Sequence, residues 1–107
     1  MKPEIVWTRG AEDDLLLLYR HLEAITDDDE LPLRLLRRPL QDSLDLLEQN
    51  PLLGRSITKQ GRLRRLLIGD RFRYGLFYTV EARGVIIHAL LDLRQDPKLI
   101  RRRLKSI

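Results

Sequence analysis

The chain has 107 residues, of which 43% are hydrophobic and 34% charged, and these values predict one folded domain over residues 1–107. No segment approaches the roughly 18 consecutive apolar residues that a membrane span needs, and the N-terminus lacks the apolar core of a signal peptide. We therefore expect a soluble cytoplasmic protein. The sequence contains no cysteine and two histidines, which excludes disulfides and thiolate metal sites and argues against a histidine-rich metal centre.

Charge is distributed unevenly between the two halves of the chain. Residues 1–54 carry six basic and twelve acidic side chains, whereas residues 55–107 carry fourteen basic and four acidic ones. The second half therefore has a net charge of +10. This asymmetry indicates a surface that attracts an anionic partner, either nucleic acid or an acidic protein segment, or else a basic surface that contacts water alone.

The first half predicts a strand and two helices. Residues 4–7 are apolar, β-branched or aromatic, as is typical of a strand, and Thr8 supplies a hydroxyl cap for a helix from Arg9 to about Ile25. After the acidic turn at residues 26–30, a leucine stripe marks a second helix that ends at Asn50, before a proline. Two helices joined by a short loop pack antiparallel. Pro39 lies inside the second helix and predicts a kink or a break there.

The second half predicts an antiparallel meander. Strand-like segments begin at residues 62, 71 and 84, with short turns at residues 69–70 and 81–84. Simple alternation in the last strand predicts one apolar face toward the helices and one more open face. The first face consists of Val85, Ile87, Ala89, Leu91 and Leu93, and the second of Ile86, His88, Leu90, Asp92 and Arg94.

A short basic helix is expected to close the chain, because Asp96 and Pro97 form a strong helix-start signal. The resulting fold class is α+β, with a small antiparallel sheet packed against an N-terminal helical hairpin and a short basic C-terminal helix.

Three groups of side chains could carry function. One is an arginine set on two neighbouring strands, which would form a compact guanidinium patch across the hairpin: Arg62, Arg64, Arg65, Arg71 and Arg73. The second is His88 with Asp92 and Arg94, which could supply a general base and charge stabilisation for RNA cleavage or could simply be packing residues. The third is the basic C-terminal helix, which could contact phosphates or only stabilise the helix end. Nucleotide-binding loops, dinucleotide fingerprints and metal-ligand clusters are missing from the sequence, so we expect no cofactor and no metal.

The order of motifs resembles the ParE branch of the RelE/ParE toxin superfamily over nearly the whole chain. The resemblance lies in residues 11–19 ("AEDDLLLLY"), residues 50–55 ("NPLLGR") and residues 71–104, which begin "RFRYGLFYTV" and end in a basic helix after Asp96-Pro97. It implies a toxin of a type II toxin–antitoxin pair that inhibits DNA gyrase by non-covalent binding. It also implies a ParD-like antitoxin partner in a hetero-oligomer, with indirect contact to nucleic acid at most.

Departures from the family pattern bear on the choice of mechanism. Asp92 stands where the family usually has His, and Gln95 replaces a second Arg. RelE-like ribonucleases use a late Tyr or His for acid-base work, and the sequence after Asp92 contains neither. Arginine stays protonated at any working pH, so the sequence favours the binding mode. The alternatives are a ribosome-dependent mRNA endonuclease with His88, Arg64 and Arg73 as its site, and a degenerate binding module without toxicity.

The expected contact residues follow from this resemblance and from the charge pattern. Those for the target are the strand and C-terminal arginines, namely Arg64, Arg65, Arg71, Arg73, Arg94, Arg101, Arg102 and Arg103. Those for the antitoxin are apolar side chains between the helical hairpin and the sheet, namely Leu18, Tyr19, Leu22, Leu66 and Ile68.

Overall fold

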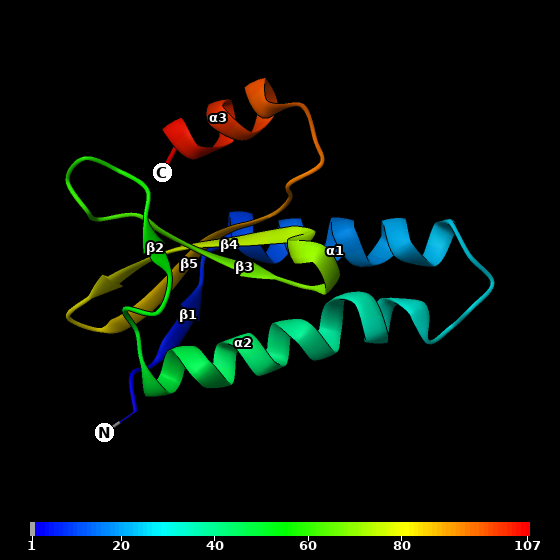
Figure 1. Ribbon diagram of the computed structural model, residues 1–107, viewed down its shortest axis with the longest axis horizontal. Helices are drawn as coiled ribbons and strands as arrows, with labels where there is room; N and C mark the ends of the chain where they lie inside the picture. The colour runs from blue at the N-terminus through cyan, green and yellow to red at the C-terminus, as the bar shows by residue number, and fades with distance from the viewer. Residues whose placement is uncertain (1) are drawn as a thin grey trace.

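The structure, a computed structural model, describes residues 2–107 and contains a mixed sheet with helices on both faces (Figure 1). Within these residues the sheet has five strands in the order β1-β5-β4-β3-β2. Their bounds are β1 Ile5–Trp7, β2 Arg55–Ser56, β3 Arg64–Ile68, β4 Tyr74–Glu81 and β5 Gly84–Asp92. Strands β3 to β5 form the expected antiparallel meander, β2 adds a short antiparallel strand that was not expected, and β1 pairs parallel to β5. The α+β fold class is confirmed.

Helix α1 (Arg9–Ala24) begins where the capping signal predicts. The Thr8 hydroxyl accepts a hydrogen bond from the Ala11 amide at 3.2 Å and so satisfies one of the free N–H groups of the first turn. The buried side of α1 packs on the sheet face that β5 and β4 share, next to α2. The expected helical hairpin on one face of the sheet is therefore present.

The second helix is irregular at Pro39, as expected. Residues Leu33–Arg37 form a π-helical turn, η1, in which the Arg38 amide donates to the Leu33 carbonyl five residues earlier. Helix α2 (Arg38–Gln49) continues directly from this turn with Pro39 as its second residue, so the wider turn lies where the missing N–H of the proline interrupts the helical hydrogen bonds. The wider turn thus accommodates Pro39 while the leucine stripe stays on the core.

Strand β5 contains a β-bulge that changes which side chains face the helices. Tyr78 pairs with Ile87 and Phe77 pairs with Ala89, so His88 is an extra residue without a partner on β4. After the bulge, Leu90 packs in the core beneath α1 and α2, while Ala89 and the odd-numbered leucines 91 and 93 turn to the opposite face. His88 lies on the expected face, but the expectation of unbroken alternation in this strand is wrong from Ala89 onward.

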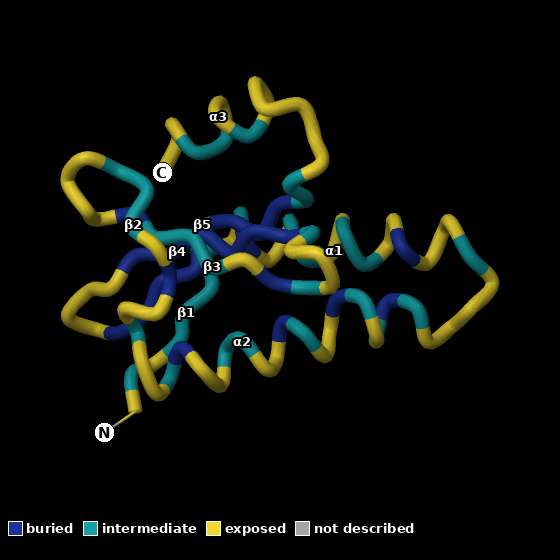
Figure 2. Tube along the Cα trace, viewed as in Figure 1, coloured by how far each residue is buried: buried dark blue, intermediate teal, exposed yellow. Residues whose placement is uncertain are grey.

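The two faces of the sheet carry two separate apolar clusters. The larger lies under α1 and α2, where buried segments of the sheet and helices face each other (Figure 2). It includes the fully buried side chains of Tyr74 and Tyr78. The smaller lies on the other face, where Ile100 and Leu104 of α3 (Pro97–Lys105) cover Phe77 and its neighbours. Asp96 caps α3 as predicted, with its carboxylate accepting from the Lys98 amide at 2.9 Å.

The connection between β3 and β4 is longer than the expected two-residue turn. It runs from Gly69 to Arg73 and contains a 3-10 turn, η2, at Asp70–Phe72. Arg71 and Arg73 thus lie outside β4, and the expectation that they share a strand face is wrong. Among residues 2–107, no helix combines the length and apolar character needed to cross a membrane.

Candidate functional site

An apolar groove of about 450 Å³ lies between α1 and α2 beside the edge strand β1. Its lining comes from all three elements and consists of Trp7, Glu12, Leu15, Leu16, Tyr19, Arg37 and Leu40. Leu16 is 49% exposed there, and its neighbour Leu17 is 70% exposed. An exposed apolar surface of this kind on a small domain is typical of a site for a protein partner.

The loop that follows α2 is pinned to the sheet by Tyr78 and Arg64. The Tyr78 hydroxyl donates to the Pro51 carbonyl at 2.8 Å and accepts from the Gly54 amide at 2.7 Å. Arg64 donates to the Gly54 carbonyl at 2.8 Å. Burial raises the pKa of Tyr78, so its hydroxyl remains a donor at neutral pH. Arg64 therefore has a structural contact on the face of the sheet that α1 and α2 cover.

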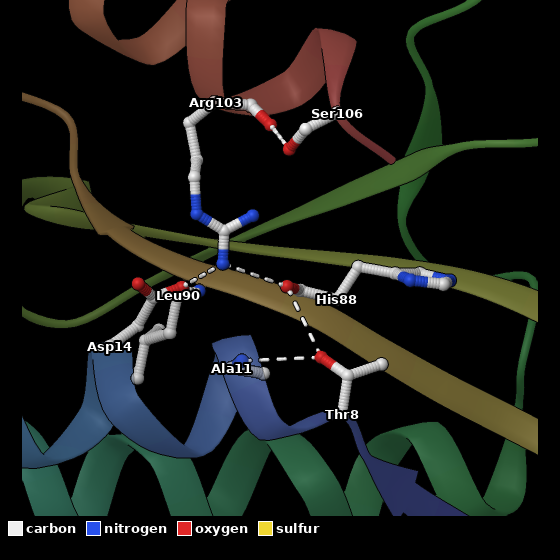
Figure 3. A network of polar contacts seen from close by, with 7 residues as sticks. All are labelled: Thr8, Ala11, Asp14, His88, Leu90, Arg103 and Ser106. Atoms are coloured by element: carbon white, nitrogen blue, oxygen red, sulfur yellow. Dashed lines mark hydrogen bonds and ion pairs between the residues drawn. The ribbon is translucent and has the colours of Figure 1, made fainter.

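A polar network ties α3 to the β5 bulge and to the start of α1 (Figure 3). Arg103 Nη2 lies 2.9 Å from the Asp14 carboxylate and also donates to the His88 carbonyl at 3.2 Å. The same Asp14 oxygen accepts from the Leu90 amide at 3.1 Å. The backbone groups that the bulge removes from strand pairing are thus satisfied by side chains from two different helices.

The carboxylate of Asp14 is mostly buried. Burial raises the pKa of Asp14, and the Leu90 hydrogen bond and the Arg103 charge offset only part of that effect. The Asp14 and Arg103 side chains are 16% and 30% exposed. Each charge therefore depends on the other, because either one alone would be left partly buried without a partner.

His88 points to the α3 face of the sheet and ends a short relay of hydrogen bonds. The Thr79 hydroxyl donates to Glu81 at 2.7 Å and lies 2.9 Å from His88 Nε2, so the ring nitrogen acts as the donor in that contact. Burial lowers the pKa of His88, although the Glu81 charge opposes the shift. The imidazole is accordingly neutral at pH 7.

The turn between β3 and β4 forms the rim of a hollow of about 400 Å³. Its lining consists of Asp70, Arg71, Phe72, Arg73, Leu93 and Arg94. Arg94 forms a two-point ion pair with Asp92, with N–O distances of 3.1 and 2.9 Å. Burial raises the pKa of Asp92, but the hydrogen bonds from Arg94 outweigh it and hold the pKa below the usual value of 3.8.

The arginines do not form one compact patch. Arg62 lies 3.9 Å from Glu81, and Arg64 pairs with Tyr78, both far along the hairpin from Arg71 and Arg73 at its turn. The expected patch across two strands is therefore wrong.

The remaining arginines occupy three different settings. Arg65 lies opposite Arg55, and its Nε is buried without a hydrogen-bond partner among the residues described. Arg101 and Arg102 on α3 are exposed, whereas Arg103 is engaged with Asp14.

The apolar residues expected to contact an antitoxin differ in accessibility. Leu22 and Ile68 are 2% and 3% exposed and belong to the core, so they offer no surface to a partner. Leu18, Tyr19 and Leu66 are half-buried, and Tyr19 lines the groove between the two helices.

Sequence reasoning missed Trp7 and Leu16 as residues that line the groove, and Asp14 as a partner of Arg103. One signal was available for the groove, because residues 15–18 are four consecutive leucines, which surround a helix on all sides and cannot all be buried. Asp14 and Arg103 are 89 positions apart, and no local pattern connects them. Within residues 2–107 no group of three or more potential ligands is arranged to hold a metal ion.

These features together define a small α+β protein with an apolar groove in its helical hairpin and a basic second half, two surfaces suited to macromolecular partners. A family model described as the ParE toxin of the type II toxin–antitoxin system parDE matches residues 5–97. The chain therefore belongs to the ParE toxin family and is the toxin component of a type II toxin–antitoxin system.

One solved structure supports the same fold. The chain is similar to a protein of a chromosomal ParDE toxin–antitoxin system from P. aeruginosa, with a TM-score of 0.68 and 19% sequence identity. The similarity covers 87% of this chain and 98% of that one. The search of curated proteins returned no match.

Proposed function

We propose that this toxin inhibits DNA gyrase by binding it non-covalently in the cytoplasm and that a ParD-like antitoxin neutralises it in a hetero-oligomer. Membership in the ParE family supports the proposal, because a resemblance to ParE toxins implies this target. The structural neighbour comes from a ParDE system, which supports a partner of the ParD kind.

The observation that carries the binding mode over RNA cleavage is that the ribonuclease candidates do not come together. Arg64 lies on the helix-covered face, where it holds the loop after α2. His88 lies on the α3 face at the bulge, and Arg73 lies at the turn before β4. A cleavage site needs an acid and a base within hydrogen-bond reach of one scissile bond.

The protonation states point the same way. His88 is neutral, and its Nε2 hydrogen is directed at Thr79, so it could accept a proton only at Nδ1. The arginines could stabilise charge but could not return that proton to a leaving oxygen, because guanidinium stays protonated at neutral pH. Inhibition by binding alone requires no proton transfer and therefore no such acid or base.

The groove between α1 and α2 is the surface that best suits the antitoxin. An amphipathic helix could bury its apolar side against Trp7, Leu15 and Leu16. Arg37 stands at the rim and would meet an acidic side chain of the bound segment. The net charge of +10 in residues 55–107 would attract the rest of an acidic, disordered tail.

Expression of the toxin without its antitoxin separates the two mechanisms. We expect arrested growth with gyrase-dependent DNA breaks and an unchanged map of RNA 3′ ends. Codon-positioned cuts in translated mRNA with intact DNA would instead establish the ribonuclease mechanism. Unaffected growth would identify the chain as a non-toxic relative.

A further inference from the structure

The turn between β3 and β4 holds two successive residues in a backbone conformation that side chains disfavour. Arg71 has φ 56° and Phe72 has φ 54°, in the left-handed region that is usual for glycine and tolerated by asparagine. The Leu93 amide donates to the Arg73 carbonyl at 2.9 Å and fixes the end of the turn against the first residue after β5. The fold therefore maintains an unfavourable geometry at this point.

That geometry presents an aromatic ring to solvent. Phe72 is 62% exposed, which is more than any other aromatic residue among residues 2–107, and it belongs to neither of the two apolar clusters. A strained and exposed aromatic residue on a turn is better explained by contact with a partner than by stability.

The surroundings of Phe72 define the chemistry of that partner. Arg71, Arg73 and Arg94 bring positive charge to the hollow beside the ring, and Asp70 and the Asp92 carboxylate stand among them. Such mixed charge reduces the attraction for a run of phosphates. Aromatic and arginine side chains together are typical anchors at protein interfaces, where a ring enters an apolar pocket and guanidinium groups meet carboxylates at its rim.

We propose that the turn Asp70–Arg73 is the contact through which the toxin docks on its target protein, with Phe72 inserted into an apolar pocket rimmed by acidic side chains. This inference rests on the proposed function in so far as the toxin acts by binding a target. The residues that line the hollow at this turn share no member with the groove between α1 and α2. Target docking and antitoxin binding thus use different side chains.

Phe72→Asn tests the proposal, because asparagine tolerates the left-handed backbone while the ring is lost. Phe72→Tyr keeps the ring and serves as the conservative variant. Leu52→Asn is the matched control, since Leu52 is 59% exposed in the loop after α2. Each full-length variant is measured for growth arrest on induction, inhibition of purified DNA gyrase, affinity for the antitoxin, binding to a naked DNA duplex and thermal midpoint.

For Phe72→Asn we expect a loss of about 30-fold in inhibitory potency, the size typical of an anchor residue. Its affinity for the antitoxin should not change, and its thermal midpoint should equal or exceed that of the wild type. Phe72→Tyr and Leu52→Asn should keep wild-type potency.

The proposal is overturned if Phe72→Asn remains fully potent, or if it loses antitoxin affinity to the same extent. A loss of DNA binding in place of gyrase inhibition would assign the turn to nucleic acid and overturn the protein contact. If the wild type arrests growth without inhibiting gyrase, the proposed target fails, and the growth arrest of Phe72→Asn still decides the role of the turn. A wild type without either effect contradicts both proposals.

Discussion

Replacing Arg103 by methionine should weaken the attachment of α3 by removing the cation that accompanies Asp14. Methionine keeps most of the length and apolar volume of the arginine stem, so the change isolates the charge. Exposed ion pairs contribute about 0.2–1 kcal/mol, whereas removing one partner of a buried pair costs about 3–5 kcal/mol. With side chains 16% and 30% exposed, this pair lies between those limits, and we expect a loss of about 2 kcal/mol at pH 7.

The loss should depend on pH in a direction fixed by Asp14. Burial holds the pKa of Asp14 above its usual value of 3.8, so its contribution to stability is present at low pH and is lost as pH rises through the folded-state pKa. Removing Arg103 raises that pKa further. The difference between wild type and variant should thus be largest at neutral pH and should shrink as acid protonates the carboxyl group.

Urea unfolding followed by tryptophan fluorescence from pH 4 to pH 8 measures this difference, since Trp7 packs against the core. Amide hydrogen exchange of residues 97–105 shows whether α3 opens separately. The double variant Asp14→Asn with Arg103→Met should recover most of the lost stability, because it removes the unpaired buried charge. A pH-independent loss, or no recovery in the double variant, would show that the unpaired charge of Asp14 is not the cause of the lost stability.

Three other changes test separate parts of the structure. Tyr78→Phe removes both hydrogen bonds that pin the loop after α2, and urea unfolding should show a loss of about 2 kcal/mol; a loss near zero would contradict the role of the hydroxyl. Leu16→Asp places a charge in the apolar groove, and calorimetric titration with the antitoxin should show at least about tenfold weaker binding with an unchanged thermal midpoint, whereas unchanged affinity would place the antitoxin elsewhere. His88→Gln should abolish the decrease in stability that the wild type shows as pH falls below 6.5, because that decrease arises when the imidazole of the unfolded chain takes up a proton before that of the folded chain does. An identical dependence of stability on pH in the two proteins would show that burial does not lower the pKa of His88.

Local signals in the sequence were sufficient for the helices. Thr8 and Asp96 cap α1 and α3 as their side chains predict, because a capping hydrogen bond spans two or three residues and depends on little else. The irregularity at Pro39 was also predictable, since a proline inside a helix removes a donor whatever the surroundings.

The features that the sequence did not predict have a different cause, because they depend on residues that are far away in the chain. The extra residue at His88 is stabilised by Thr8, Asp14 and Arg103, all from other elements, and alternation of apolar residues contains no sign of it. The functional surfaces could be predicted from the sequence only in part, for the same reason. Composition located the basic half, but it could not show that Arg64 holds a loop while Phe72 projects from a strained turn.

If this ParE-family toxin acts on DNA gyrase by binding and not by cleaving RNA, as we propose, its effect appears on the purified enzyme. The most direct measurement is ATP-dependent supercoiling of relaxed plasmid by purified gyrase, titrated with purified toxin. We expect inhibition to rise with toxin concentration and a stoichiometric amount of the ParD-like antitoxin to restore activity. Full supercoiling activity at toxin concentrations that arrest growth would contradict the proposal.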